Sequence, residues 1–166
     1  MRSIEMTFDA ATEARLRDDW ARLAEAGLPS LALHTAASNR PHVTLVAGAD
    51  LAVPTGVPAL PAAIDFAGLL LFPHGDRFVL AWSVVRSREL DELQRSVWHP
   101  DALPTSQPDA WTPHVTLSRR LSADQVAAAL PLLGAPFAGA ATGVRFWDGE
   151  TKTLTAIPSS TGPDHP

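Results

Sequence analysis

The pentapeptide Pro-His-Val-Thr-Leu occurs twice in this chain of 166 residues, at positions 41–45 and again at 113–117. Each copy alternates polar and apolar residues, which is the pattern of a half-buried β-strand. In such a strand the histidine and threonine share one face, while the valine and leucine share the other. The repeat therefore predicts two strands with matching polar faces, and it restricts the fold to one that holds both.

Similar elements precede the two copies. Residues 3–8 alternate like a strand, and residues 10–26 place apolar side chains at helical spacing. Residues 77–85 and a helix over 87–98 lead into the second copy in the same order. The order strand, helix, loop and pentapeptide thus occurs twice, and an internal duplication is the simplest explanation.

The other predicted elements share the same short, apolar character. We expect a hairpin with a four-residue turn, a short helix and two final strands, at 64–72 with 77–85, at 123–133, and at 143–147 with 151–157. Prolines and glycines between residues 50 and 61 indicate a linker between elements.

This order predicts an α+β fold. We expect a bilobal molecule of two pseudo-symmetric lobes, with antiparallel sheets lining a central cleft and helices on the outside. Residues 1–158 are predicted to form this single domain, and residues 159–166 are predicted to form a flexible tail.

Composition narrows the possible partners. Thirteen basic and eighteen acidic residues give a net charge of −5, so a nucleic-acid substrate should be short or contacted at one end. The absence of cysteine excludes disulfides, thiolate metal sites and cysteine nucleophiles. Charges spread over the first twenty residues argue against a signal peptide or membrane span. We therefore expect a cytoplasmic monomer without membrane contact or an obligate protein partner.

The repeated residues have a chemistry in common. His42 and Thr44 share one face of the first strand, and His114 and Thr116 share one face of the second. If the two faces meet across a cleft, one neutral imidazole can take a proton from water while the other, protonated, gives one to a departing oxygen. Threonine hydroxyls can donate to the non-bridging oxygens of a phosphate. Phosphodiester cleavage fits this set, and it requires no metal and no cofactor.

Other residues near the motifs have a functional and a structural interpretation. Arg119, if the second strand continues that far, is expected to share the face of His114 and to clamp a phosphate. Arg120 beside it also permits a solvated basic turn. Trp82 and Trp111 are typical of core residues. Phe72, at the edge of the hairpin, is more typical of a packing residue, with a position lining the cleft as the alternative.

The motifs His42-Val43-Thr44-Leu45 and His114-Val115-Thr116-Leu117 resemble those of the two-histidine (2H) phosphoesterase superfamily, in particular its bacterial 2′-5′ RNA ligase-like, or RNA 2′,3′-cyclic phosphodiesterase, branch. The continuation Ser118-Arg119 is similar to the basic ending of the second motif in that branch. The resemblance implies a bilobal fold, metal-free catalysis by the two histidines, and substrates with 2′,3′-cyclic phosphates or 2′-5′ linkages.

These observations predict a metal-independent phosphodiesterase that acts on a nucleotide or a short RNA end. The predicted acid–base pair is His42 and His114, and the predicted phosphate-binding residues are Thr44, Thr116 and Arg119. An alternative is a non-catalytic module of the same fold that binds a nucleotide or RNA end. A third is a metal-dependent hydrolase, although neither motif contains a carboxylate. The sequence does not distinguish the acid from the base.

Overall fold

A computed structural model describes residues 1–160 of the chain, and this part contains three α-helices and two four-stranded sheets. The helices are α1 (Ala10–Glu25), α2 (Arg88–Val97) and α3 (Ala123–Ala129). The strands are β1 (Arg2–Phe8), β2 (His42–Gly48), β3 (Ile64–His74), β4 (Arg77–Val84), β5 (His114–Leu121), β6 (Phe137–Gly139), β7 (Ala141–Asp148) and β8 (Thr153–Ile157). Single 3₁₀ turns are η1 (Leu31–Leu33), η2 (Pro104–Ser106) and η3 (Leu130–Leu132).

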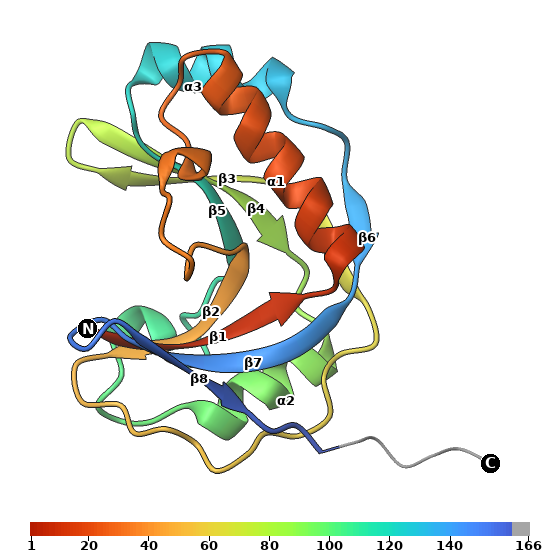
Figure 1. Cartoon of the computed structure of the whole chain (residues 1–166), viewed down its shortest axis with the longest axis vertical. Helices are drawn as coiled ribbons and strands as arrows, with labels where there is room; N and C mark the ends of the chain where they lie inside the picture. Colours follow the sequence, from red (N-terminus) through yellow and green to blue (C-terminus); the bar gives the residue numbers. More distant parts are fainter. Residues whose placement is uncertain (161–166) are drawn as a thin grey trace.

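All neighbouring strands in the two sheets run antiparallel, which confirms the predicted α+β class. The first sheet has the strand order β2-β1-β7-β8, and the second has the order β5-β4-β3-β6. The first sheet is strongly curled, with β7 sweeping beneath β1 in Figure 1. Each sheet therefore has a pentapeptide strand at one edge, next to the strand that precedes it in the sequence.

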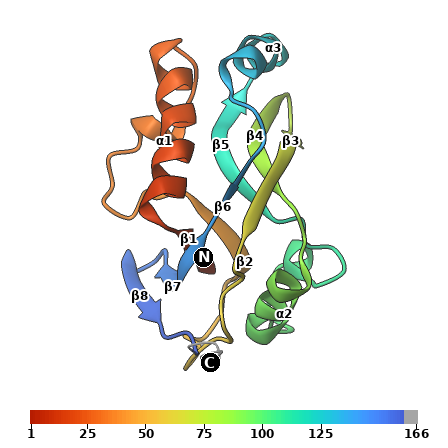
Figure 2. The same cartoon turned by 90° about the vertical axis from the view of Figure 1, so that its right-hand side faces the viewer.

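The two edge strands β2 and β5 lie side by side, so the sheets meet along the repeated motifs. Each connecting helix packs against the opposite sheet. Helix α1 joins β1 to β2 but contacts β5 and β6, whereas α2 joins β4 to β5 but contacts β2. Figure 2 shows these two helices on opposite sides of the molecule. The two sheets consequently share one continuous hydrophobic core.

Local chemistry explains the limits of α1. Asp9 caps its start by accepting the backbone N–H of Thr12 at 2.8 Å. The helix ends before Gly27, whose φ of 72° lies in the left-handed region that favours glycine. The N–H of Leu28 then returns to the carbonyl of Leu23 at 3.0 Å. In residues 1–160 no helix has both the length and the apolar composition that crossing a bilayer requires.

Several predicted boundaries differ from the structure. The β3–β4 hairpin closes with a two-residue turn, because Gly75 adopts a φ of 64° and lets His74 pair with Arg77. The predicted helix 123–133 becomes 3₁₀ at η3, which contains Pro131. Strand β6 was not predicted, since three residues are too short to show a period.

The predicted tail is partly described. Ser159 bridges to Val57, and the N–H of Ser160 donates to the Val57 carbonyl at 2.9 Å. The rest of the tail, residues 161–166, lies outside the described residues.

Candidate active site

Strands β2 and β5 present their repeated residues in the same way. His42 and Thr44 are partly exposed, as are His114 and Thr116. The valine and leucine of each motif are completely buried in the core. The alternation predicted from the sequence is therefore present in both strands.

Each strand also contains a bulge directly after its threonine. Opposite β1, residues Thr44 and Val46 pair with consecutive residues, so Leu45 is the extra residue. Opposite β4, Thr116 and Ser118 pair with consecutive residues, so Leu117 is the extra residue. The duplication thus includes a β-bulge at the same position in both strands, which the residue types of the motif do not indicate.

The second bulge determines where Arg119 points. We expected Arg119 to share the face of His114 if the strand continued that far. Unbroken alternation from Thr116 would instead place Ser118 on that face and Arg119 on the opposite one, so a regular strand would not have met this expectation. After the bulge the positions are exchanged: Ser118 is completely buried and donates to the carbonyl of Pro29. Arg119 is exposed and lines the same pocket as His42. Its position in the site therefore depends on the bulge.

Both imidazoles are oriented by the same backbone contact. The Nδ1–H of His42 donates to the carbonyl of Arg40 at 2.7 Å, and that of His114 donates to the carbonyl of Thr112 at 2.8 Å. Each carbonyl lies two residues before its histidine, on the other side of a proline. Because these bonds hold the proton on Nδ1, each Nε2 is left to exchange a proton with a substrate or water.

Two indoles fix the edge strands in place. Trp111 donates from Nε1 to the backbone carbonyl of Thr44 at 2.9 Å, and Trp20 of α1 donates to the carbonyl of Thr116 at 3.1 Å. Trp82, also buried, donates to Asp19 at 2.9 Å. The core interpretation of Trp82 and Trp111 is therefore confirmed, and Trp111 in addition positions the first motif.

The ring of His114 is largely buried and lies against an aromatic side chain. Its ring centre lies 4.6 Å from that of Phe72, which thus belongs to the site. Burial lowers the pKa of His114 below its usual value, a hydrogen bond to the Thr112 carbonyl opposes the shift, and the positive charges of His42 and Arg119 add to it. The two histidines stand on the edge strands β2 and β5, which lie side by side.

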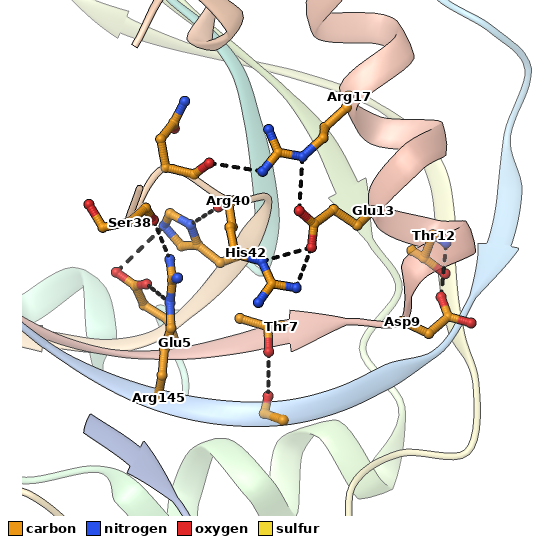
Figure 3. A network of polar contacts seen from close by, with 12 residues as sticks. Glu5, Thr7, Asp9, Thr12, Glu13, Arg17, Ser38, Arg40, His42 and Arg145 are labelled. Atoms are coloured by element: carbon orange, nitrogen blue, oxygen red, sulfur yellow. Dashed lines mark hydrogen bonds and ion pairs between the residues drawn. The ribbon is translucent and has the colours of Figure 1, made fainter. Parts of the chain in front are cut away.

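The surroundings of His42 differ, because they contain a carboxylate (Figure 3). Glu5 of β1 has a side chain only 7% exposed, and its Oε1 lies 3.7 Å from the Nε2 of His42. Arg145 of β7 pairs with the other oxygen at 2.8 Å, and Ser3 donates to Oε1 at 2.7 Å. The position facing Thr116 in the second sheet, equivalent to Glu5, is Ala81. Among residues 1–160, a carboxylate therefore pairs with the imidazole of His42 and none pairs with that of His114.

Sequence reasoning identified neither Glu5 nor Arg145 as a site residue. The alternation of residues 3–8 shows that Glu5 lies on the polar face of its strand. That face was expected to be exposed, but β1 lies between β2 and β7 and both its faces are buried. A charged residue between apolar neighbours, as at Arg145, is the signal that would have pointed to a buried partner.

Ion pairs also hold the loop that leads into His42. Arg145 donates to the carbonyl of Ser38 at 3.0 Å, which ties the loop to β7. Arg40 pairs with Glu13 of α1, and Arg17 pairs with the same carboxylate at 2.8 Å. Burial raises the pKa of Glu13, but the hydrogen bonds and charges of Arg40 and Arg17 outweigh this and lower it overall. The Arg40 carbonyl that orients His42 is thereby anchored to α1.

A pocket of about 630 Å³ opens beside His42. Its floor comes from β1, β2 and β7, and residues of the loop after η1 and of β5 complete the wall. Of the predicted site residues, His42, Thr44 and Arg119 line this pocket, whereas His114 and Thr116 are not part of its lining. The free space of the site thus lies mainly on the side of the first motif.

Among residues 1–160, no group of three or more His, Asp or Glu side chains is arranged to hold a metal ion. The side chains that the fold collects are two imidazoles, two hydroxyls, a carboxylate and two guanidinium groups, which can move protons and bind an anion. Comparison of the chain with models of protein families and with curated proteins finds no match.

Proposed function

We propose that this chain is a metal-independent phosphodiesterase in which His42 and His114 act as an acid–base pair across a cleft between two lobes. One observation carries the proposal: the two imidazoles come from equivalent edge strands, and each has its Nδ1–H bound to a backbone carbonyl. Both Nε2 atoms are therefore left for proton transfer, and the strands that hold them lie side by side. The alternative, a binding module, has no need for this matched orientation.

The different surroundings of the two histidines indicate which one acts as the base and which one acts as the acid. His114, whose pKa is lowered by burial, is neutral near pH 7 and takes a proton from the attacking water. His42 is then the residue that gives a proton to the oxygen that leaves phosphorus, and the Glu5 carboxylate lies 3.7 Å from its Nε2. The phosphorus–oxygen bond to water forms as the bond to the departing oxygen breaks. Solvent then restores the starting protonation states.

The remaining predicted residues stabilise the phosphate. Thr44 and Thr116 stand two residues after the histidines on the same strand faces, so their hydroxyls can donate to the non-bridging oxygens. Arg119 supplies a positive charge where negative charge develops. The resemblance of the motifs to those of the 2H phosphoesterases suggests the substrate class, 2′,3′-cyclic phosphates or 2′-5′ nucleotide linkages. A cytoplasmic monomer acting on short RNA ends is part of the same proposal.

The test is phosphorus NMR of the products formed from 2′,3′-cyclic nucleotides and 2′-5′ dinucleotides in excess EDTA. We expect conversion to phosphomonoesters at an unchanged rate. Loss of activity with EDTA and its return with zinc or manganese would favour the metal-dependent hydrolase. Tight nucleotide binding without any turnover would favour the binding module.

The pH dependence should report the lowered pKa of His114. A base must be neutral to act. We therefore expect the midpoint of the acidic limb of the kcat/KM profile to lie below about pH 6.5, the usual pKa of histidine. Phe72→Ala, which admits water to the ring, should move this limb upward toward that value. The adjacent exposed Leu71 provides the control, since Leu71→Ala should leave the limb in place. An acidic limb above about pH 6.5 would contradict the assignment of His114 as base.

Glu5→Gln tests whether the carboxylate beside His42 takes part in the reaction. Its Oε1 lies 3.7 Å from the His42 Nε2, so removing the negative charge should lower kcat while the fold persists. Arg145 then also loses its charged partner. Ser3→Ala, which removes a neutral hydrogen bond to the same carboxylate, should leave kcat close to wild type. An equal kcat in Glu5→Gln and wild type would show that the carboxylate has no part in the reaction.

A further inference from the structure

The pocket beside His42 extends well beyond the residues that the proposed reaction uses. At its far end lies Trp147 of β7, two residues after Arg145 and therefore on the same face of the curled first sheet. The chain passes close to this indole at Gly149, where a Cβ would lie 3.6 Å from the indole Nε1. Trp147 thus borders space that the reacting groups leave unfilled.

Trp147 differs from the tryptophans of the core. The three buried indoles each donate a hydrogen bond, to Thr116, Asp19 and Thr44. Trp147 is partly exposed, and within residues 1–160 its N–H has no hydrogen-bond partner. An aromatic ring with a free N–H, open to a pocket, can stack on a planar ligand and donate to it.

The strand register places the indole away from the reacting phosphate. In β1, Thr7 lies opposite His42 and Ser3 lies opposite Trp147. The imidazole of His42 reaches toward this end of the strand, since its Nε2 lies 3.7 Å from Glu5. The two residues from Glu5 to Ser3 span about 7 Å of extended strand, so a phosphate at His42 and a group at the indole occupy neighbouring but separate parts of the pocket. Any group that contacts Trp147 must therefore be another part of the same substrate.

The groups between the two ends indicate what that part is. Glu5 and Arg145 pair with each other on the pocket floor, so their charges are largely balanced there. Ser3, Ser38 and Asn39 add polar groups to the wall. A polar middle suits a sugar, and an aromatic end suits a planar base.

We propose that Trp147 is the stacking surface for the nucleobase of the substrate, so that the pocket holds a nucleoside while the histidines hold its phosphate. This inference rests on the proposed function for the position of the phosphate. It assigns the preference for nucleoside phosphates over other phosphodiesters to one side chain outside both repeated motifs.

The experiment compares kcat/KM for adenosine 2′,3′-cyclic phosphate with that for glycerol 1,2-cyclic phosphate, which has no base. In Trp147→Ala the ratio of the two values should fall by about 10- to 100-fold, the loss expected for one stacked base. Trp147→Phe should keep most of the ratio, because it preserves an aromatic face and the folded packing. Trp98→Ala is the matched control, since Trp98 is exposed at the end of α2 and should leave the ratio unchanged. An unchanged ratio in Trp147→Ala would overturn the proposal.

Calorimetric binding of adenosine 3′-monophosphate and ribose 5-phosphate separates the two proposals. Stronger binding of the nucleotide, lost in Trp147→Ala, supports the base site even if the chain hydrolyses nothing, in which case only the proposed reaction fails. Histidine-dependent turnover with equal binding of the two ligands would instead remove the base site and leave the reaction. Equal losses for both ligands in Trp147→Ala would indicate a structural role and also overturn the base site.

Discussion

His42→Ala and His114→Ala are each expected to lower kcat by about 10²- to 10⁴-fold, because each removes one half of a proton relay. Both side chains are partly exposed, so their removal leaves no cavity in the core and the fold should persist. The double variant should lose little more than either single one, since the pair acts as a unit.

Steady-state kinetics on a 2′,3′-cyclic nucleotide, with circular dichroism to verify folding, measures this effect. His74→Ala is the matched control, because His74 is exposed at the end of β3, away from the pocket. Near wild-type turnover in either folded variant of the pair would exclude the mechanism. If only one of the two variants keeps its turnover, the motif that contains its histidine has at most a binding role.

The strands and helices that position the site could be predicted because their information is local. Alternation defined β2 and β5, and the helical spacing of α1 was readable from Leu16, Trp20 and Leu23. The duplication then placed the two motifs in equivalent positions without any knowledge of the fold. His42 and His114 followed from this pattern alone.

The bulges could not be predicted in this way. A bulge adds one residue to one strand, and its presence depends on the partner strand as much as on its own residues. Leu45 and Leu117, the extra residues of the two bulges, do not differ in residue type from the leucines of a regular buried strand. The position of Arg119 therefore required the observed register.

The Glu5–Arg145 pair lies beyond sequence reasoning for another reason. Its members are 140 positions apart, and they meet only because β7 pairs with β1. Nothing in either segment identifies the partner.

The packing of α1 could be predicted only in part. The apolar face of the helix predicts that it is buried but does not tell which sheet covers it, and the helix in fact packs on the second sheet.

That packing depends on Asp19, where we expect the largest effect on stability. Its carboxylate is completely buried between α1 and the second sheet. Trp82 of β4 donates to it at 2.9 Å, and Arg15 pairs with it at 2.9 Å. The Nη1 atom of Arg15 is buried and, within residues 1–160, has no hydrogen bond, so this ion pair is its compensation. The pair with Arg22, at 3.2 Å, is half exposed and contributes less.

Asp19→Ala should therefore lower the free energy of unfolding by about 3 to 5 kcal/mol, the range for removing one partner of a buried ion pair. The loss leaves the Trp82 N–H and a buried guanidinium nitrogen without their acceptor, and both would have to find water. Urea denaturation of the variant measures the effect, and the adjacent, exposed Asp18 provides the control, with Asp18→Ala expected within about 0.5 kcal/mol of wild type. Trp20, the next residue of α1, donates to the Thr116 carbonyl, so loosening α1 should also free β5 from this hydrogen bond and reduce kcat before global unfolding. A denaturation midpoint equal to that of Asp18→Ala would show that apolar contacts alone hold α1 to the second sheet.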